Sequence, residues 1–225
     1  MKIGVVMDPI ESINFKKDST LAMMLEAQSR KHQLFYMTPD SLYINEKGAF
    51  AIAKTLQVKN DPTGWFDFKE EKQIKLSELD VILMRQDPPF NSNYIYNTYV
   101  LESAEKEGVL VVNKPSSLRD CNEKVFATEF PECCTPFLVA SDPNLLKSFI
   151  EDHKDTVIKP LDGMGGSSIF RLRNTDPNLN VILETITDEF MTKVMIQTYK
   201  EKQKHFQRLI KLWLYVVQVN LQMKL

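Results

Sequence analysis

The chain has 225 residues, a formal net charge of −2, 43% hydrophobic residues and 26% charged residues. This composition is typical of a globular protein with a sizeable core, and the near-neutral charge argues against nucleic acid or an anionic membrane surface as a partner. Since no apolar run approaches the ~18 residues of a membrane-spanning helix and Asp8 and Pro9 interrupt the first one, we expect a cytoplasmic protein.

The first elements predict a βαβ unit. Residues 2–7 (KIGVVM) form a short apolar run, typical of a buried strand, that ends at Asp-Pro. Residues 18–32 have apolar positions near helical spacing, with Asp18 or Ser19 able to cap the helix. Residues 33–37 (QLFYM) indicate a second strand. A strand, a helix and a strand over this length favour a right-handed crossover in a parallel sheet.

The following segment continues the α/β pattern to about residue 130. We expect short meander strands within 41–76 (SLYI, AFAIAKTLQV and GWFDF), a buried strand at 79–85, a helix over 91–108 that ends at Gly108, a strand at 109–113 and a short helix near 122–129. The first 115 or so residues therefore predict an open α/β sheet.

The alternation of predicted strands and helices continues beyond residue 135. Strands are expected at 136–140, 156–161, 168–173 and 193–199, with helices over 142–154, capped by Asp142, and over 178–189. The fold class is therefore α/β, with an N-terminal open parallel sheet followed by a second region.

Three glycines, Gly163, Gly165 and Gly166, lie between two predicted strands in the stretch VIKPLDGMGGSSIF. Glycine permits positive φ and close backbone approach, so such a loop can fold over an anion and present N–H groups to it. Lys159 could add a point charge to the same phosphate. A hairpin with a mobile glycine tip fits the pattern equally well.

Charged residues follow two other predicted strands. Arg85 and Asp87 come at the end of strand 79–85, and the loop after strand 2–7 should lie on the same edge of the sheet, where ligands bind in open α/β folds. Arg85 suits a substrate carboxylate, although an Arg–Asp surface pair that closes the loop is the alternative. Lys124 is a second candidate for a phosphate, and its alternative is a solvated surface lysine.

The cysteines give no sign of a metal site. Cys121, Cys133 and Cys134 have no C-x-x-C spacing, and the chain has only three histidines. We expect reduced, structural thiols and no zinc.

Six stretches, in order over residues 1 to about 199, resemble the bacterial glutathione synthetases of the ATP-grasp superfamily. They are VMDPI, KKDST, LDVILMRQDPPF, VVNKPSSLRDCNEK, IKPLDGMGGSSIFR and DPNLNVILETIT. The resemblance implies an N-terminal α/β substrate-side domain over 1–120 and the first part of an ATP-grasp domain over 121–199. Residues 200–225 would be an atypical tail.

The resemblance also implies a reaction. ATP would phosphorylate the cysteinyl carboxylate of γ-glutamylcysteine, and the amine of glycine would attack the acyl phosphate to give glutathione, ADP and phosphate. Such chemistry requires positioning and charge neutralisation rather than a protein nucleophile. Intact family members would be homo-oligomers.

By position in the family pattern, the ATP-binding residues would be Lys124, Lys159, Gly163, Met164, Gly165, Gly166, Gln197 and Tyr199. The glycine loop would be a flap over the phosphates, and Gln197 to Tyr199 would hold adenine. Arg85 and Asp87 would face the dipeptide.

The pattern departs from the family after Tyr199. The family's Y-L-P turn, its G-D-K-R strand and the half that carries the catalytic arginine and the Mg²⁺ ligands do not follow. The last 26 residues have five lysines and one arginine against one glutamate, with no glycine, proline or aspartate. A truncated or frame-shifted chain is the simplest interpretation, with a natural C-terminus as the alternative. Catalytic residues and metal ligands are then absent from the sequence, and we expect little or no activity.

Two other functions remain open from the sequence. One is another ATP-grasp ligase that joins a carboxylate to an amine, such as a D-alanyl-D-alanine or glutamate ligase, although the DPPF segment argues against it. The other is a non-catalytic fragment that binds intact subunits.

Overall fold

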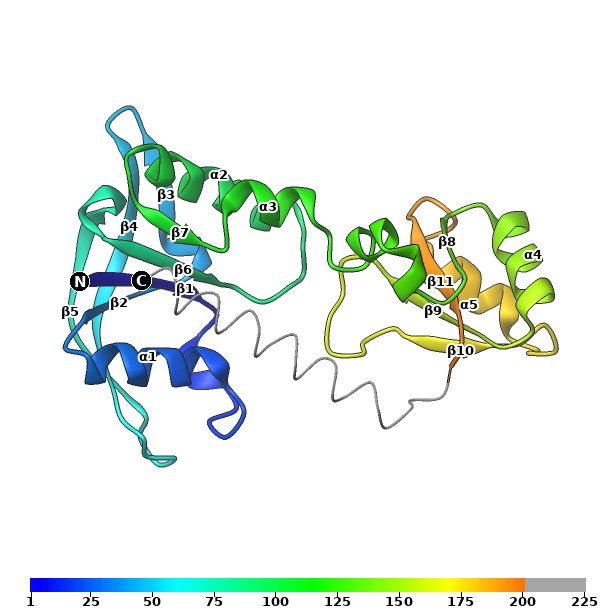
Figure 1. Cartoon of the computed structure of the whole chain (residues 1–225), viewed down its shortest axis with the longest axis horizontal. Coiled ribbons are helices and arrows are strands. Elements are labelled where there is room, and N and C mark those ends of the chain that lie inside the picture. The colour runs from blue at the N-terminus through cyan, green and yellow to red at the C-terminus, as the bar shows by residue number, and fades with distance from the viewer. Residues whose placement is uncertain (201–225) are drawn as a thin grey trace. The chain divides into compact units, whose positions relative to one another are not determined.

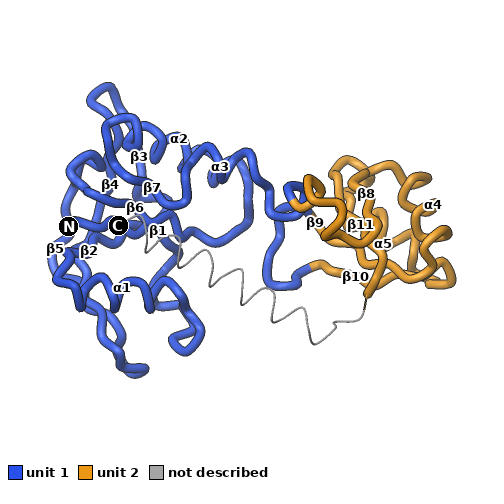
Figure 2. The backbone as a smooth tube through the Cα atoms, viewed as in Figure 1, with its two compact units in different colours: residues 1–126, 161–167 blue, residues 127–160, 168–225 orange. Residues whose placement is uncertain are grey.

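The computed structural model describes residues 1–200, so the tail expected at 200–225 lies outside the described residues except for Lys200. The chain divides into two compact units (Figure 2). Unit 1 comprises residues 1–126 and 161–167, and unit 2 comprises residues 127–160 and the residues from 168 onward.

Unit 1 is built on a seven-stranded sheet with helices on both faces (Figure 1). Its elements are β1 (Lys2–Met7), α1 (Ser19–Ser29), β2 (Gln33–Met37), β3 (Leu42–Asn45), β4 (Gly48–Val58), β5 (Phe66–Lys75), β6 (Val81–Arg85), α2 (Ser92–Lys106), β7 (Leu110–Val112) and α3 (Pro115–Asp120). Short 3₁₀ turns occupy Ile10–Ser12, Pro39–Ser41 and Leu76–Glu78.

The strand order is β3-β4-β2-β1-β6-β7, and β5 pairs with β4. The four strands β2, β1, β6 and β7 are parallel, which confirms the parallel βαβ unit predicted at the N-terminus. The meander expected within 41–76 is also confirmed, because β3, β4 and β5 pair antiparallel in turn. Its last strand is longer than the sequence pattern suggested and reaches Lys75.

The apolar run of β1 is explained by burial on both faces of the sheet. Val5 packs in a cluster with Leu21 and Met24 of α1. Val6, the next residue, packs in a separate cluster with Leu101 of α2. Successive side chains of a strand point to opposite faces, so a strand covered by helices on both sides must be apolar throughout.

Side-chain caps fix the starts of both long helices. Asp18 accepts a hydrogen bond from the backbone N–H of Leu21 at 2.6 Å, as its sequence position predicted. Asn91 accepts one from the N–H of Tyr94 at 3.0 Å and so begins α2. Gly108, with φ +102°, follows the end of α2, which fits its expected role as the stop.

The short helix expected near 122–129 is misplaced. The α-helix in this region is α3, over Pro115–Asp120, and residues Phe126–Glu129 form only a 3₁₀ turn. Pro115 lies in the first turn of α3, where a missing N–H is tolerated. Tertiary contacts also support α3, because Arg119 donates to Glu102 Oε1 at 2.7 Å and to Thr98 Oγ1 at 3.1 Å.

Unit 2 is a four-stranded antiparallel sheet in the order β10-β9-β11-β8. Its elements are β8 (Phe137–Ala140), α4 (Pro143–His153), β9 (Thr156–Pro160), β10 (Phe170–Leu172), α5 (Leu179–Ile186) and β11 (Val194–Thr198), with 3₁₀ turns at Phe126–Glu129, on its boundary with unit 1, and at Pro131–Cys133. All six strands and helices fall where the sequence predicts them, and Asp142 caps α4 by accepting from the N–H groups of Asn144 and Leu145.

The helices of unit 2 cover one face of its sheet. Leu146 and Ile150 of α4 and Leu183 of α5 pack in one cluster with Ile158 and Ile196, and all five side chains are fully buried. Residues that alternate with this set, such as Val157 and Gln197, lie on the opposite face and are only half-buried.

The segment 161–167 leaves the sheet of unit 2 and is bound to unit 1. Asn122 Nδ2 donates to the carbonyl of Leu161 at 3.1 Å, and Lys124 Nζ donates to the carbonyl of Gly163 at 2.6 Å. The N–H of Phe90 lies 3.4 Å from the carbonyl of Asp162. The glycine-containing loop is therefore tethered at its start.

Within residues 1–200, none of the helices has both the length and the apolar character needed to cross a membrane.

Substitution of two adjacent leucines in α4 tests which face of this helix packs in the core of unit 2. Leu146 is fully buried, whereas Leu145 is 54% exposed. We expect Leu146→Ala to lower the free energy of unfolding by about 2–5 kcal/mol, because it removes buried methyl groups and leaves a cavity. Leu145→Ala should cost less than about 1 kcal/mol. Urea unfolding monitored by circular dichroism compares the two, and equal losses would contradict the assigned orientation of α4.

Asn122→Ala tests the tether of the glycine loop. Asn122 Oδ1 also accepts from the N–H groups of Lys124 and Val125, so alanine removes three hydrogen bonds of about 1 kcal/mol each. We expect faster amide hydrogen exchange in 161–167 and unchanged exchange in β1 and β6. Asn122→Asp keeps the bonds to the N–H groups of Lys124 and Val125 but places a carboxylate oxygen against the Leu161 carbonyl, so it should also speed exchange in the loop. Unchanged exchange of the loop in Asn122→Ala would show that the tether lies elsewhere.

Candidate functional site

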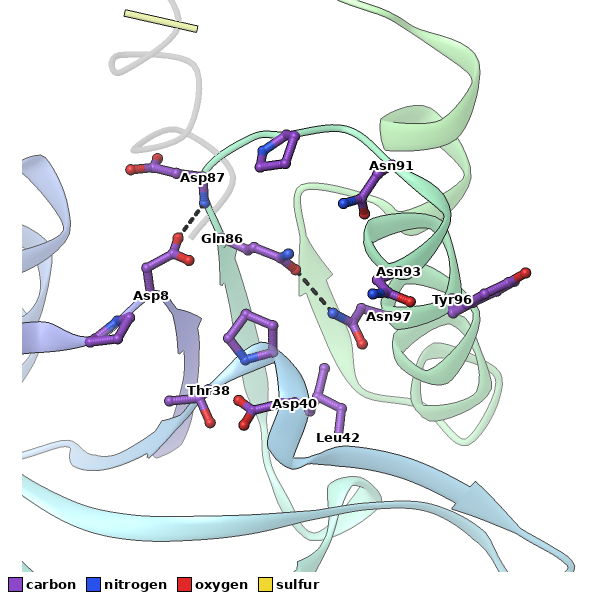
Figure 3. Close-up of a pocket in the computed structure, with 13 residues that line it drawn as sticks. Asp8, Thr38, Asp40, Leu42, Gln86, Asp87, Asn91, Asn93, Tyr96 and Asn97 are labelled. Atoms are coloured by element: carbon purple, nitrogen blue, oxygen red, sulfur yellow. Dashed lines mark hydrogen bonds between the residues drawn. The ribbon is translucent and has the colours of Figure 1, made fainter. Parts of the chain in front are cut away.

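The carboxyl ends of β1 and β6 bring together the loops that follow them. The two strands pair in parallel with Met7 opposite Arg85, so Asp8 and Gln86 begin adjacent loops. Asp8 Oδ2 accepts a hydrogen bond from the N–H of Asp87 at 2.7 Å (Figure 3). The prediction that both loops lie on one edge of the sheet is confirmed.

Arg85 is held by hydroxyl groups rather than by an acid. Its Nε donates to Thr20 Oγ1 and its Nη2 donates to Ser19 Oγ, both at 3.0 Å. Thr20 is buried, and both hydroxyls belong to the first turn of α1. Among residues 1–200, Arg85 forms no ion pair within 4.0 Å, so the alternative of an Arg85–Asp87 surface pair is wrong. The guanidinium therefore has no carboxylate within 4.0 Å among these residues, although its charge acts on Asp87 at longer range.

Asp87 lies in an environment that disfavours its ionised form. Partial burial raises the pKa of its carboxyl group above the ordinary value, and the negative charges of Asp8 and Asp18 add to this effect. Arg85 opposes the shift and lowers the pKa. A cation next to Asp87 would relieve the repulsion between these carboxylates.

Two cavities share Asp8 and Asp87 as lining residues. The larger, of about 570 Å³, is lined by Asp8, Pro9, Thr38, Pro39, Asp40, Leu42, Gln86, Asp87, Pro89, Asn91, Asn93, Tyr96 and Asn97 (Figure 3). The smaller, of about 330 Å³, is lined by Met7, Asp8, Ser12, Ile13, Asn14, Lys17, Asp18, Ser19, Thr20, Arg85 and Asp87. In Figure 3 the Asp87 side chain points away from Gln86 and Asn91.

Lys124 is not a solvated surface lysine. Its side chain is 11% exposed, and its Nζ donates to Glu123 Oε1 at 2.7 Å and to the carbonyl of Gly163 at 2.6 Å. The alternative that Lys124 is a solvated surface lysine is therefore wrong. The structure brings Lys124 against the glycine loop within unit 1.

The glycine loop itself is exposed and has the backbone conformation that its sequence suggested. Gly165 and Gly166 have φ of +67° and +83°, and a Cβ added at either would meet no heavy atom within 4 Å. The space beside these two glycines is therefore open to a ligand. Met164 lies at the same tip with 45% of its surface exposed.

The predicted site residues of unit 2 share one face of its sheet. Gln197 pairs with Val157 in register, so Lys159 and Tyr199, each two residues further along, point to the same side. This is the face opposite the one that α4 and α5 cover. The guanidinium of Arg171 lies 3.6 Å from the centroid of the Tyr199 ring.

Two arginines form ion pairs with Asp155 at the edge of this face. Arg171 donates to both carboxylate oxygens of Asp155, at 2.8 and 2.6 Å, and Arg173 adds a contact at 3.2 Å. Their hydrogen bonds lower the pKa of the Asp155 carboxyl to about 2, so the pair persists across the physiological pH range. Arg171 is thereby held in position beside Tyr199.

Some residues of the site were missed from the sequence. Asn122, which tethers the glycine loop, lies two positions before Lys124, a spacing at which an Asn side chain accepts from the following backbone N–H groups. Ser19 and Thr20 hold Arg85, but from the sequence Ser19 was considered only as a helix cap and Thr20 was not considered at all. The two adjacent hydroxyl residues at the start of a predicted helix were the feature of the sequence that could have indicated this contact.

Metal-ligating side chains do not gather in the described part of the chain. Among residues 1–200 no group of three or more His, Cys, Asp or Glu is arranged to hold a metal ion. The three cysteines are free thiols, with Cys121 and Cys133 exposed and Cys134 half-buried.

Solved ATP-grasp proteins share the fold of this chain. An ATP-grasp RimK domain protein from Sphaerobacter thermophilus aligns with a TM-score of 0.56 at 12% identity, over 90% of this chain and 66% of that one. D-alanyl-alanine synthetase A from Vibrio cholerae aligns with a TM-score of 0.52 at 10% identity, over 89% of this chain and 59% of that one. These likenesses confirm the α/β fold with a partial ATP-grasp domain.

Curated relatives are much more similar in sequence. Glutathione synthetases from Vibrio parahaemolyticus, Vibrio cholerae and Pseudomonas putida are 53%, 55% and 56% identical over 199 residues. The alignments cover 88% of this chain and 63% of each relative, so the chain spans less than two thirds of their length.

Two family models match consecutive parts of the chain. The N-terminal domain of prokaryotic glutathione synthetase matches residues 1–119, and the ATP-grasp domain of the same enzyme matches residues 123–213. The second match extends beyond Tyr199 into the C-terminal segment, whose composition differs from that of the rest of the chain. The first match alone covers more than half of the 225 residues. The resemblance found in the sequence is confirmed: the chain belongs to the prokaryotic glutathione synthetase family.

Proposed function

We propose that the chain serves in the ATP-dependent ligation of γ-glutamylcysteine and glycine to give glutathione, ADP and phosphate. Identity above 50% to glutathione synthetases supports this activity over that of other ATP-grasp carboxylate–amine ligases. The observation that carries the proposal is the position of Lys124, a partly buried cation held against the carbonyl of Gly163 at the start of an exposed glycine loop.

The chemistry sets what the site must supply. A carboxylate is a poor electrophile, so the γ-phosphoryl group of ATP is first transferred to the cysteinyl carboxylate, and ADP leaves. The amine of glycine then attacks the carbonyl carbon of the acyl phosphate, and phosphate leaves as the peptide bond forms. Neither step uses a protein nucleophile, so the protein contributes by positioning the reactants and neutralising charge.

Lys124 and Lys159 are proposed to neutralise the phosphates of the nucleotide. A lysine ammonium can exchange its partners without loss of charge, and Lys124 now donates to carbonyl and carboxylate oxygens that phosphate oxygens can replace. The N–H groups near Gly165 and Gly166 would complete the phosphate site, since open space lies beside both residues. Gly163 and Met164 would close with them as a flap that excludes water from the acyl phosphate.

Gln197 and Tyr199 are proposed to bind the adenine. They share with Lys159 the sheet face that no helix of the described residues covers, and this face is polar at Gln197 and aromatic at Tyr199. Arg171 holds the Tyr199 ring in place from one side. An amide and a fixed ring suit a flat heterocycle with hydrogen-bonding edges.

Mg²⁺ is expected to accompany ATP, as it does for ATP-dependent phosphoryl transfer in general. The described residues hold no cluster that fits the ion, so it enters the proposal only with the nucleotide. The cytoplasm, where ATP is abundant, is the proposed location.

Nucleotide binding tests this function. We expect the chain to bind Mg²⁺–ATP, measured by isothermal titration calorimetry with a non-hydrolysable analogue. Lys124→Met and Lys159→Met should each weaken binding by roughly ten-fold or more, because each removes a charged hydrogen bond to phosphate. Lys106→Met is the control, since Lys106 is an exposed lysine of α2 with 76% of its side chain accessible.

Two results would contradict the proposal. One is a nucleotide affinity that neither lysine variant changes, which would place the phosphates elsewhere. The other is the absence of nucleotide binding by a folded chain. ADP release that requires both γ-glutamylcysteine and glycine would show that the chain turns over, and would overturn only the expectation of low activity.

A further inference from the structure

The methionines of the chain fall into two groups by exposure. Nine of the ten lie in residues 1–200. Five of these are in the cores of the two units and are each at most 3% exposed, namely Met7, Met24, Met37, Met84 and Met195. The other four are more than a third exposed, namely Met1, Met23, Met164 and Met191. Because a peroxide has to reach the sulfur in order to oxidise it, these four are the candidates for oxidation in the described part of the chain.

Met164 differs from the other three because it lies in the glycine loop. Its neighbours Gly163 and Gly165 have no side chains that could shield the sulfur. The carbonyl of Met164 accepts from the N–H of Ser167 at 3.2 Å, so the backbone turns at this point. Open space lies beside Gly165 and Gly166. A peroxide can therefore reach Met164 whenever no ligand covers the loop.

The residue before Met164 holds the cation of the proposed nucleotide site. The carbonyl of Gly163 accepts from Lys124 Nζ at 2.6 Å, and the carbonyl of Leu161 lies 3.5 Å from the same nitrogen. A thioether is a weak hydrogen-bond acceptor, whereas a sulfoxide is polar and its oxygen accepts well. A sulfoxide oxygen one residue beyond Gly163 can compete with a phosphate oxygen for Lys124.

We propose that Met164 is an oxidation site, and that its conversion to the sulfoxide by a peroxide weakens nucleotide binding at the glycine loop. The sulfur donates an electron pair to one peroxide oxygen, and the O–O bond breaks. The second oxygen leaves as hydroxide and takes up the proton of the transferred oxygen, so the products are one sulfoxide and one water. The effect on the nucleotide rests on the proposed function, in which this loop closes over the phosphates.

Nucleotide and peroxide should therefore compete for the same open loop. A nucleotide bound beneath the loop covers Met164 and slows its oxidation. The sulfoxide in turn opposes closure, because its oxygen has to lose bound water and comes close to phosphate oxygens of like charge. Oxidation of the other exposed methionines has neither consequence, since they lie outside the loop.

The rate of oxidation of each methionine tests the first consequence. The full chain is treated with hydrogen peroxide, with and without Mg²⁺ and a non-hydrolysable ATP analogue, and sulfoxides are followed by peptide mass spectrometry. We expect saturating nucleotide to slow oxidation at Met164 roughly five-fold or more, because only the nucleotide-free fraction stays open. Met191, which is 83% exposed in the turn between α5 and β11, is the matched control and should oxidise at the same rate in both samples.

Isothermal titration calorimetry before and after peroxide tests the second consequence. Dithiothreitol is added after the peroxide, so that oxidation of the exposed cysteines is reversed. Oxidised wild-type chain should bind the nucleotide roughly five-fold more weakly or worse, the effect of one lost hydrogen bond. Methionine sulfoxide reductase should restore the affinity.

Variants then assign the loss to one sulfur. Met164→Leu should have the same affinity before and after peroxide, whereas Met191→Leu should lose affinity on oxidation as the wild-type chain does. Met164→Gln, which carries an amide oxygen in place of the sulfoxide oxygen, should bind more weakly than Met164→Leu without any peroxide. In Lys124→Leu the effect of peroxide should be smaller, because the ammonium for which the sulfoxide competes is absent. Thermal unfolding confirms that each variant is folded.

Three results would overturn the inference. They are oxidation of Met164 no faster than that of the buried Met37, unchanged affinity of a chain fully oxidised at Met164, and an equal loss of affinity in Met164→Leu on treatment with peroxide. If nucleotide binds but leaves the oxidation rate of Met164 unchanged, the nucleotide site stands and the inference is wrong. If the untreated chain binds no nucleotide while Met164 oxidises as fast as Met191, the proposed function fails and the oxidation site stands.

Discussion

The geometry of unit 1 depends on the parallel pairing of β1 with β6. Because the two strands run in the same direction and Met7 lies opposite Arg85, the loops that follow them start side by side. The pairing is stable because β1 is buried on both faces, between α1 and α2, and β6 has every second residue buried. A shift of the register by one residue would turn Val5 and Val6 each toward the wrong helix, so the core itself fixes the position of Asp8 relative to Asp87.

A second constraint acts on Arg85. The capped start of α1 places Ser19 and Thr20 where their hydroxyls meet the guanidinium, and the cap depends on Asp18. The three consecutive residues Asp18 to Thr20 therefore begin a helix and orient a charged side chain from the end of β6. The hydroxyls orient the guanidinium by accepting its hydrogen bonds and carry no charge themselves, whereas an acid in their place would cancel the charge of Arg85.

Much of this organisation could be predicted from the sequence. The buried strands are continuous apolar runs, and Asp18 and Asp142 mark helix starts that the structure confirms. The shared edge of Asp8 and Asp87 follows from parallel topology alone.

The features that could not be predicted depend on contacts with residues far away in the sequence. The helix α3 has only six residues and relies on contacts of Arg119 with α2, so its position near Pro115 was not evident from local pattern. The burial of Lys124 depends on a loop almost forty residues later.

The tethered segment 161–167 has a consequence for how this chain can be divided. Unit 1 is discontinuous in sequence: the chain leaves it after Phe126, returns at Leu161 and leaves again after Ser167. A gene fragment that ends at residue 126 would lack the segment to which Asn122 and Lys124 donate, and would leave the ammonium of Lys124 without the Gly163 carbonyl. A single proteolytic cut between the units would not release either one intact. A circular permutation or domain exchange of this chain has to carry residues 161–167 together with the strand pairs of unit 1.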